Sequence, residues 1–309
     1  MNIIFMGTPE FAVPCLEALC DSDSVCAVFT QPDKPKGRGN KVTKSPVKEY
    51  AESRSIPVFQ PMSLRRGDDA EIALKTIESL SPDLIIVTAY GQILPESILT
   101  LPKYGCINMH ASILPKLRGA APIQYALLNG DKRTGVTSQQ MGTGLDTGDM
   151  LITETLTIGE DETAPELTER LSKLAAKVMA DTIIALKSGS LNPVKQIDSD
   201  STYAPMIQKE MSLIDFSGDI EKENNKIKAI TGYAFFEGKR IKILRSFITD
   251  KLSKTPVGTL ISEGGKLFVN IGGKLLGISE LQLEGGKKQT AEQFLPGHKI
   301  TDGMVLTDE

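Results

Sequence analysis

Short apolar runs that do not alternate with polar residues constrain the fold of this chain most strongly. Four such runs, rich in Ile and Val, occupy residues 2–7, 24–30, 82–90 and 105–110. Strands of this kind are buried on both faces, as in a parallel sheet covered by helices. Helix-like stretches lie between them at 10–20, 45–54 and 68–80. The alternation predicts βαβ units, and hence an α/β domain with a doubly wound, mostly parallel sheet.

A change of pattern near Met206 predicts a second, smaller domain. A long amphipathic helix is expected over 163–189, with Thr163 and Glu166 as a capping box and Gly189 as its end. The polar segment that follows contains two prolines. Beyond it, short runs alternate or end at glycine pairs, which favours a small antiparallel barrel or sandwich. Of the two, we expect an OB-like β-barrel. We therefore expect a first domain at 1–189, a linker at 190–205 and a β-barrel domain at 206–309.

Composition limits the class of protein. The length of 309 residues suits roughly two domains. No apolar run approaches the roughly 20 residues of a membrane helix, and the N-terminus lacks the basic start of a signal peptide. The four cysteines form no CxxC pair, which favours reduced thiols over a disulfide framework or a zinc site. We expect a cytoplasmic monomer that binds no metal and no membrane.

One of the two histidines follows the fourth apolar run, in the sequence Asn108-Met109-His110. Open α/β folds bind ligands at the carboxyl ends of their strands. Residues two apart in a strand point the same way, so Asn108 and His110 are expected on one face. The amide could donate to a developing oxyanion while the imidazole takes or relays a proton. The alternative is a core histidine bonded to a backbone carbonyl.

A second segment offers a carboxylate. Residues 135–141 are expected to form a strand, and the glycine-rich loop after it carries Asp146 and Asp149. Glycines allow close backbone approach. An aspartate held in such a loop can orient a histidine, although an ordinary turn rich in Asp and Gly is the alternative. Taken together, the two segments predict a catalytic group of Asn108, His110 and Asp146.

The segment 32–48 is strongly basic. It carries six Lys or Arg residues against one acid, Asp33, and its prolines and glycines predict neither helix nor strand. Because it follows the second predicted strand, it lies at the same sheet edge as the candidate site. A basic segment there suggests contact with a polyanion, with a solvated charged loop as the alternative.

Two phosphate-binding patterns are absent. The sequence GTPEFA after the first strand lacks the later glycines of a dinucleotide loop, and GRGNKVTKS is not a GxxxxGK[ST] loop. A nicotinamide enzyme and an NTPase are therefore disfavoured.

Residues 108–151 closely resemble the core of the 10-formyltetrahydrofolate-dependent formyltransferases. The Asn-x-His, Ser-Ile-Leu-Pro and Leu-Asp-x-Gly-Asp motifs all match. The opening MGTPEFAVPCLEAL, the basic segment and the Tyr-Ala-Pro before the second domain are similar to members that act on tRNA. The resemblance covers nearly the whole chain. It departs after Ile230, where the segment is several residues shorter than in those members and the chain has no tryptophan.

The resemblance implies a Rossmann-like formyltransferase fold and a reaction. The formyl group of 10-formyltetrahydrofolate would pass to the α-amino group of methionine on initiator tRNA, for translation initiation. Asn108, His110 and Asp146 would be catalytic. The folate would be bound by Ser112, Ile113, Leu114, Pro115, Tyr90, Gly91, Gln92, Ile93 and Leu94. The tRNA would be bound by the second domain and by Lys36, Arg38, Lys41 and Lys44.

Three alternatives share parts of this pattern. A formyltransferase for a sugar amine or another small amine would keep the catalytic residues, but would not need the basic segment or the second domain. A formyl-folate hydrolase would use water as acceptor. A folate- or RNA-binding regulatory protein would not need Asn108, His110 and Asp146 together. The residue pattern is the same whether His110 acts as a charged donor or as a neutral base.

Overall fold

The computed structural model describes residues 1–36, 41–301 and 303–308. The chain divides into two compact units. The first comprises Met1–Gly119, Thr134–Leu156 and Thr168–Ala204, and the second comprises Ala120–Arg133, Thr157–Leu167 and Pro205–Glu309.

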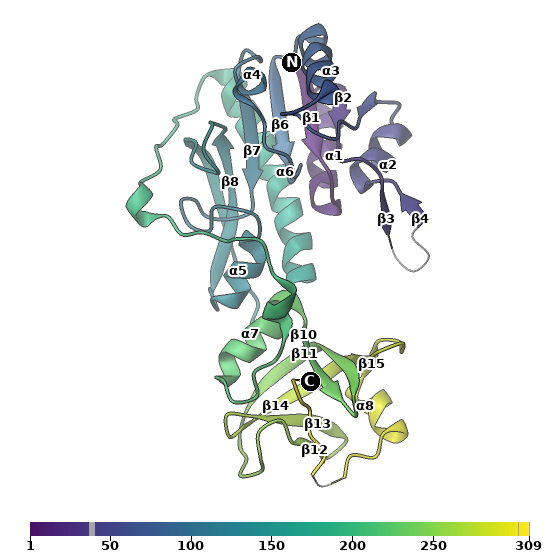
Figure 1. The fold of residues 1–309 in the computed structure, drawn as a ribbon. Coiled ribbons are helices and arrows are strands. Elements are labelled where there is room, and N and C mark those ends of the chain that lie inside the picture. The colour runs from purple at the N-terminus through teal and green to yellow at the C-terminus, as the bar shows by residue number, and fades with distance from the viewer. Residues whose placement is uncertain (37–40, 302, 309) are drawn as a thin grey trace. The chain divides into compact units, whose positions relative to one another are not determined.

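The first unit contains the predicted α/β sheet. The four apolar runs form β1 (Asn2–Gly7), β2 (Ser24–Phe29), β6 (Leu84–Thr88) and β7 (Cys106–His110). The other strands of this sheet are β5 (Val58–Phe59), β8 (Arg133–Gln140) and β9 (Met150–Thr157). The strand order is β5-β2-β1-β6-β7-β8-β9. Figure 1 labels the five central strands, from β2 to β8, in this order across the sheet. Pairing is parallel from β5 to β7 and antiparallel between β7 and β8. The mostly parallel α/β sheet is thus confirmed.

Helices follow the strands as the alternation predicts. They are α1 (Val13–Ser22) after the 3₁₀ turn η1 (Glu10–Ala12), α2 (Pro46–Ser53), α3 (Asp68–Leu80), α4 (Glu96–Leu99) and α6 (Ala164–Ser188). Ser45 caps α2 by accepting from Lys48 N, and Gly189, with φ of 68°, ends α6. A core that includes Ile4, Phe29 and Ile85 fixes the sheet.

The basic segment corrects one expectation. Lys34–Lys36 (β3) and Lys41–Thr43 (β4) pair as a two-stranded antiparallel ribbon, so the prediction of no strand is wrong for these six residues. Both strands of such a ribbon are edge strands, and an edge strand tolerates Pro35. Lys48 Nζ lies 2.7 Å from Asp33 Oδ2 at the base of the ribbon. Arg38 lies outside the described residues.

The second unit is built on an antiparallel sheet. Its order is β10 (Gly232–Phe236), β11 (Lys239–Leu252), β14 (Lys274–Leu283), β13 (Lys266–Ile271) and β12 (Leu260–Glu263), with β15 (Gln289–Thr290) paired to β14. The helices are α5 (Pro122–Leu128), α7 (Ile220–Ile230) and α8 (Ala291–Phe294), and the remaining 3₁₀ turns of the chain are η2 (Asp198–Asp200), η3 (Lys209–Ser212) and η4 (Leu295–Gly297). Where the sequence is short after Ile230, only Thr231 separates α7 from β10.

The C-terminal residues hydrogen bond to both ends of this sheet. Phe235 N, in β10, donates to Thr307 O at 2.8 Å. Leu260 N, at the start of β12, donates to Met304 O at 2.8 Å. The segment 304–307 thereby satisfies backbone groups on the two outer strands, which would otherwise present unpaired edges.

Glu166, at the start of α6, has a strongly perturbed carboxyl group. Its Oε2 accepts from Thr163 Oγ1 at 2.6 Å and from Thr163 N at 2.8 Å, as the predicted capping box requires of the glutamate. Its Oε1 accepts from Arg245 NH2 at 2.6 Å. These hydrogen bonds, those from Thr163 first, lower the pKa of Glu166 from 4.5 to about 2.

We expect Glu166→Gln to lower the free energy of unfolding at pH 7 by about 1 kcal/mol, because the carboxylate is 47% exposed and its ion pair is screened by water. A depressed folded-state pKa stabilises the fold above pH 4.5, and this stabilisation is lost as the pH falls towards 2. Urea unfolding of both proteins at pH 7 and pH 2.5 measures the difference. Glu169→Gln, which removes an exposed pair with Lys173, is the control, and an equal loss in the two variants would contradict the assignment.

Candidate active site

The structure brings His110 and Asp146 together. His110 ends β7, and its imidazole is 6% exposed. Its Nδ1 lies 3.7 Å from Asp146 Oδ2, and its Nε2 lies 2.9 Å from the carbonyl oxygen of Leu117. The sequence left open a core histidine bonded to a backbone carbonyl. The structure contains that hydrogen bond and also places the Asp146 carboxylate beside the ring. Since the carbonyl can only accept, Nε2 carries a proton and Nδ1 is the nitrogen that faces Asp146.

Asn108 lies on the same face of β7, two residues before His110. In the antiparallel pairing of β7 with β8, Asn108 is opposite Gln139 and His110 is opposite Thr137. The Asn108 side chain is partly exposed, and its amide makes no hydrogen bond to the described part of the chain. An amide in that state can bind a substrate oxygen.

Asp146 is held by two donors. Its Oδ2 accepts from Gly119 N at 2.9 Å, and its Oδ1 accepts from Gln139 Nε2 at 2.8 Å. Its backbone φ of 51° is in the left-handed region, which aspartate tolerates better than most residues. A Cβ on Gly148 would lie 1.6 Å from Gln140 O, so only glycine fits at that position of the loop.

The segment after His110 is anchored to β8. Thr137 Oγ1 donates to Ser112 O at 2.8 Å and is also 3.2 Å from Leu114 N, and Ser112 Oγ donates to Lys116 O at 2.6 Å. The Leu114-Pro115 peptide is cis. Ser112 and Leu114 are buried, whereas Ile113 and Pro115 are partly exposed. Of these four predicted folate contacts, Ile113 and Pro115 present the most side chain to a ligand.

The predicted contacts at 90–94 follow β6, the parallel neighbour of β7. Tyr90 and Leu94 belong to the core of the first unit, and burial raises the pKa of Tyr90, which keeps its phenol neutral. Gln92 is engaged with backbone groups, since its Oε1 accepts from Leu64 N at 2.9 Å and its Nε2 donates to Pro61 O at 2.8 Å. Gly91 and Ile93 are exposed. They are therefore the members of this set that a ligand can reach from solvent.

The predicted tRNA contacts are only partly described. Lys36 and Lys41 pair opposite each other in the β3–β4 ribbon. Lys44 Nζ lies 2.5 Å from Glu52 Oε2, and half of its side chain is exposed. Arg38 is among the residues that the structure does not describe.

Three polar residues at this site were missed by the sequence analysis. Gln139 bonds Asp146, Gln196 bonds the backbone of the Asp146 loop, and Arg118 bonds Gln196. The alternation in β8 could have placed Gln139 on the face of Asn108. No local pattern marks Gln196, because it lies in the segment predicted as a linker.

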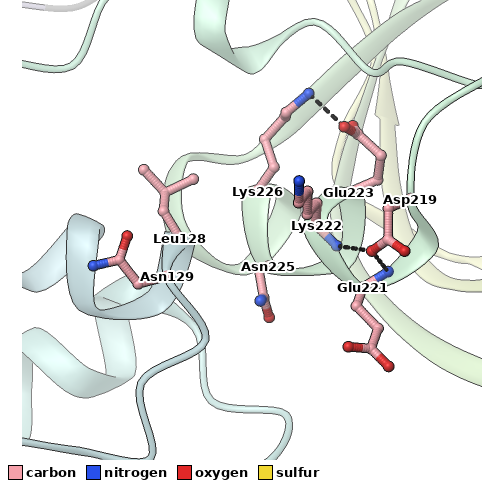
Figure 2. A pocket seen from close by; sticks show the side chains of 8 residues that line it. All are labelled: Leu128, Asn129, Asp219, Glu221, Lys222, Glu223, Asn225 and Lys226. Carbon is pink, nitrogen blue, oxygen red and sulfur yellow. Dashed lines mark hydrogen bonds and ion pairs between the residues drawn. The ribbon is translucent and has the colours of Figure 1, made fainter.

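Two surface pockets have linings that do not include Asn108, His110 or Asp146. One, of about 630 Å³, belongs to the second unit and is lined by charged side chains around the start of α7. Figure 2 shows Asp219 capping that helix and Lys226 paired with Glu223, so these side chains already have partners. The other, of about 190 Å³, is lined by residues that include Phe29, Phe59 and Ala73.

Other chemistry near the site is limited. Burial raises the pKa of the Cys106 thiol, at the start of β7, to about 12, so it is not a thiolate nucleophile at neutral pH. Within residues 1–36, 41–301 and 303–308, no group of three His, Cys, Asp or Glu side chains could hold a metal ion. Over the same residues, no helix has the length and apolar character required to cross a membrane.

An α/β domain with an amide, an imidazole and a carboxylate at one strand end, followed by an antiparallel β domain, corresponds to a known class of enzymes. Residues 1–183 match the formyl transferase family, and residues 206–299 match the C-terminal domain of formyl transferases. The chain belongs to the formyl transferase family.

Two relatives that are similar over nearly the whole chain share a name. The methionyl-tRNA formyltransferase of Caldanaerobacter subterraneus subsp. tengcongensis is 45% identical over 311 residues, covering 99% of this chain and all of the relative. The methionyl-tRNA formyltransferase of Geotalea uraniireducens is 47% identical over 312 residues, covering 99% of this chain and 98% of the relative.

Solved structures share the fold at low identity. A sugar 3N-formyl transferase, WlaRD, determined with dTDP and 5-N-formyl-THF, has a TM-score of 0.66 at 18% identity, over 90% of this chain and 97% of its own. HypX from Aquifex aeolicus in complex with tetrahydrofolic acid has a TM-score of 0.63 at 14% identity, over 98% of this chain and 48% of its own. At these identities the likeness concerns the fold alone.

Proposed function

We propose that this enzyme transfers the formyl group of 10-formyltetrahydrofolate to the α-amino group of methionine esterified to initiator tRNA. The product would be N-formylmethionyl-tRNA for translation initiation. The observation that carries the proposal is the near-complete match to methionyl-tRNA formyltransferases, together with the convergence of His110 and Asp146 beside Asn108.

In the proposed reaction, the amine nitrogen attacks the formyl carbon and forms the new N–C bond. The carbonyl oxygen becomes an oxyanion, to which the Asn108 amide and the charged His110 donate. Collapse of the intermediate breaks the bond between that carbon and N10 of the folate. The proton lost from the amine reaches N10 through His110 or a water.

The geometry of His110 supports this role. The hydrogen bond from Nε2 to Leu117 O fixes the plane of the ring. The 3.7 Å between Nδ1 and Asp146 Oδ2 exceeds a hydrogen-bond length. Nδ1 can therefore contact a substrate atom or a water that Asp146 also contacts.

For the folate, we propose contacts from the two predicted sets, 90–94 and 112–115. They follow β6 and β7, which are adjacent and parallel, so both sets start from the same edge of the sheet. The buried members would support the walls of the folate pocket; they are Tyr90, Leu94, Ser112 and Leu114. The members that solvent reaches, Gly91, Ile93, Ile113 and Pro115, would contact the ligand.

For the tRNA, we propose contacts from Lys36, Arg38, Lys41 and Lys44 and from the second domain. The catalytic domain would comprise 1–189, the linker 190–205 and the tRNA-binding domain 206–309. The hydrogen bonds of 304–307 to β10 and to the start of β12 support the proposal that this domain closes as an OB-like barrel. We also propose that the protein is a cytoplasmic monomer.

Arg38→Ala is expected to raise KM for methionyl-tRNA about tenfold, with KM for 10-formyltetrahydrofolate changed less than about twofold, because a phosphate contact acts on one substrate only. Steady-state kinetics at several salt concentrations measures both constants, and the variant should show a shallower salt dependence. Lys103→Ala, a basic residue outside this segment, is the control. Equal effects on the two substrates would contradict the assignment.

The function itself is tested with 10-formyltetrahydrofolate and labelled methionyl-tRNA, initiator and elongator, by measuring formylated product. Formylation of the initiator tRNA is the expected result. Release of formate without an acceptor would indicate a hydrolase, and formylation only of a small amine or an amino sugar would indicate the nearest alternative. Absence of turnover with every acceptor would favour a regulatory binding protein.

A further inference from the structure

Gln196 uses its whole side-chain amide to join two loops of the candidate site. Its Nε2 donates to Asp146 O at 2.8 Å and to Gly148 O at 2.7 Å. Its Oε1 accepts from Arg118 Nε at 2.9 Å. The first two contacts hold the loop that carries the carboxylate. The third holds the residue next to Leu117, whose carbonyl accepts from His110.

Arg118 strengthens the same connection. Its side chain is 2% exposed, and besides Gln196 it contacts Asp198, with NH2 2.9 Å from Oδ1. A buried guanidinium needs partners for its charge and its donors. Both of the partners found here come from residues 196–198, so the position of that short stretch is tied to the position of Arg118.

Backbone hydrogen bonds extend this attachment over residues 194–204. Val194 and Met150 exchange two bonds of 2.8 Å just after the Asp146 loop. At the other end, Arg118 N donates to Thr202 O at 2.8 Å, and Ala204 N donates to Arg118 O at 2.7 Å. Leu117 N donates to Thr202 Oγ1 at 2.9 Å. The 194–204 segment therefore runs from one catalytic loop to the other and is bonded to both.

We propose that Gln196 is a positioning residue of the formyl transfer, acting through Asp146 and through the carbonyl that fixes His110. Without it, the 146–148 loop would keep the side-chain contacts of Asp146 to Gly119 and Gln139 but lose two backbone anchors. The inference rests on the proposed function, because it assigns Asp146 and His110 their roles. It adds that Gln196, in the segment predicted from the sequence to be a linker, is a working part of the catalytic site.

The test uses the full-length chain with Gln196→Met, which keeps the size of the side chain and removes its hydrogen bonds. We expect kcat for methionyl-tRNA to fall about 10- to 100-fold, since small displacements of catalytic groups cost that much. Both KM values should change less than about twofold. Ser199→Ala, in the same segment but with a side chain that donates to neighbouring Asp200, is the control and should keep its kcat.

A double-mutant cycle separates positioning from a general loss of structure. If Gln196 acts through Asp146, adding Gln196→Met to Asp146→Asn should lower kcat by less than about threefold. The same fold-loss in both backgrounds, or an unchanged kcat in the single variant, overturns the proposal.

A readout without catalysis separates this proposal from the proposed function. Amide exchange at Gly119, whose N–H bonds Asp146, should become faster in Gln196→Met, and unchanged exchange overturns the proposal. Failure of the wild-type chain to formylate methionyl-tRNA would instead overturn the proposed function.

A second variant is available if Gln196→Met does not fold. Asp198→Asn changes a partner of Arg118 that is 85% exposed. It should lower kcat about threefold or more at an unchanged Tm, and an unchanged kcat overturns the proposal.

Discussion

We expect His110→Ala to lower kcat for methionyl-tRNA formylation by about 10³-fold or more, while the chain stays folded. In the proposed reaction the imidazole donates to the oxyanion and transfers the proton of the amine. Losing an oxyanion donor costs about 10²–10³-fold, and losing a general acid or base costs about 10²–10⁴-fold. Because His110 combines both roles, the larger values apply.

Single-turnover formylation with saturating folate measures this effect directly, and circular dichroism verifies the fold of the variant. The other histidine provides the matched control. His298 stacks on Phe294 at 4.1 Å, and its Nδ1 is 3.1 Å from Phe294 O. His298→Ala should therefore keep kcat close to that of the wild type. Near-normal turnover of purified His110→Ala would refute the catalytic assignment.

Replacement of Asp146 by asparagine is expected to lower kcat by about 10²–10³-fold. The two oxygens of Asp146 accept from Gly119 N and Gln139 Nε2, so the NH₂ of an asparagine must face one of these donors. The side chain would turn or shift, and an imidazolium formed at His110 during proton transfer would lose the negative charge beside it. Displacement and lost charge each weaken stabilisation of the oxyanion.

Asp149→Asn, at the second aspartate of the same loop, is the control. The backbone carbonyl of Asp149 accepts a hydrogen bond from Gln140 N at 2.9 Å. Because asparagine keeps that carbonyl, the variant should lose less than about threefold in kcat. Rate constants from single turnovers at several pH values compare the two. If both variants lose the same activity, the loop rather than the carboxylate of Asp146 is what matters.

Local patterns predicted the parts of the fold that local interactions control. The apolar runs of β1, β2, β6 and β7 were predictable because a strand buried on both faces must be apolar throughout. The end of α6 at Gly189 was predictable because a residue with positive φ is favoured there. The β3–β4 ribbon was missed, since a pair of three-residue edge strands leaves almost no periodic signal.

The residues of the proposed catalytic group could be singled out in the sequence for a chemical reason. Histidine, asparagine and aspartate side chains lower stability when they are buried without partners, but they can donate, accept and transfer protons. They were therefore easy to notice next to apolar strands. Their neighbours were not, because Gln139, Arg118 and Gln196 are ordinary surface types whose hydrogen bonds at this site come from tertiary contacts. Arg118 and Gln196 are 78 positions apart in the chain.

The amino-acid sequence alone determined which apolar and amphipathic segments form the main strands and helices of the first unit, and which side chains can carry the chemistry, because periodicity and residue type are local properties. Only the tertiary structure decided that β8 pairs antiparallel with β7, that Asp146 reaches His110, and that residues 194–204 hydrogen bond to both loops of the candidate site. The reason is that periodicity assigns a residue to a face of its own element. Which distant segments satisfy its hydrogen bonds is settled only when the elements pack and every buried polar group must find a partner.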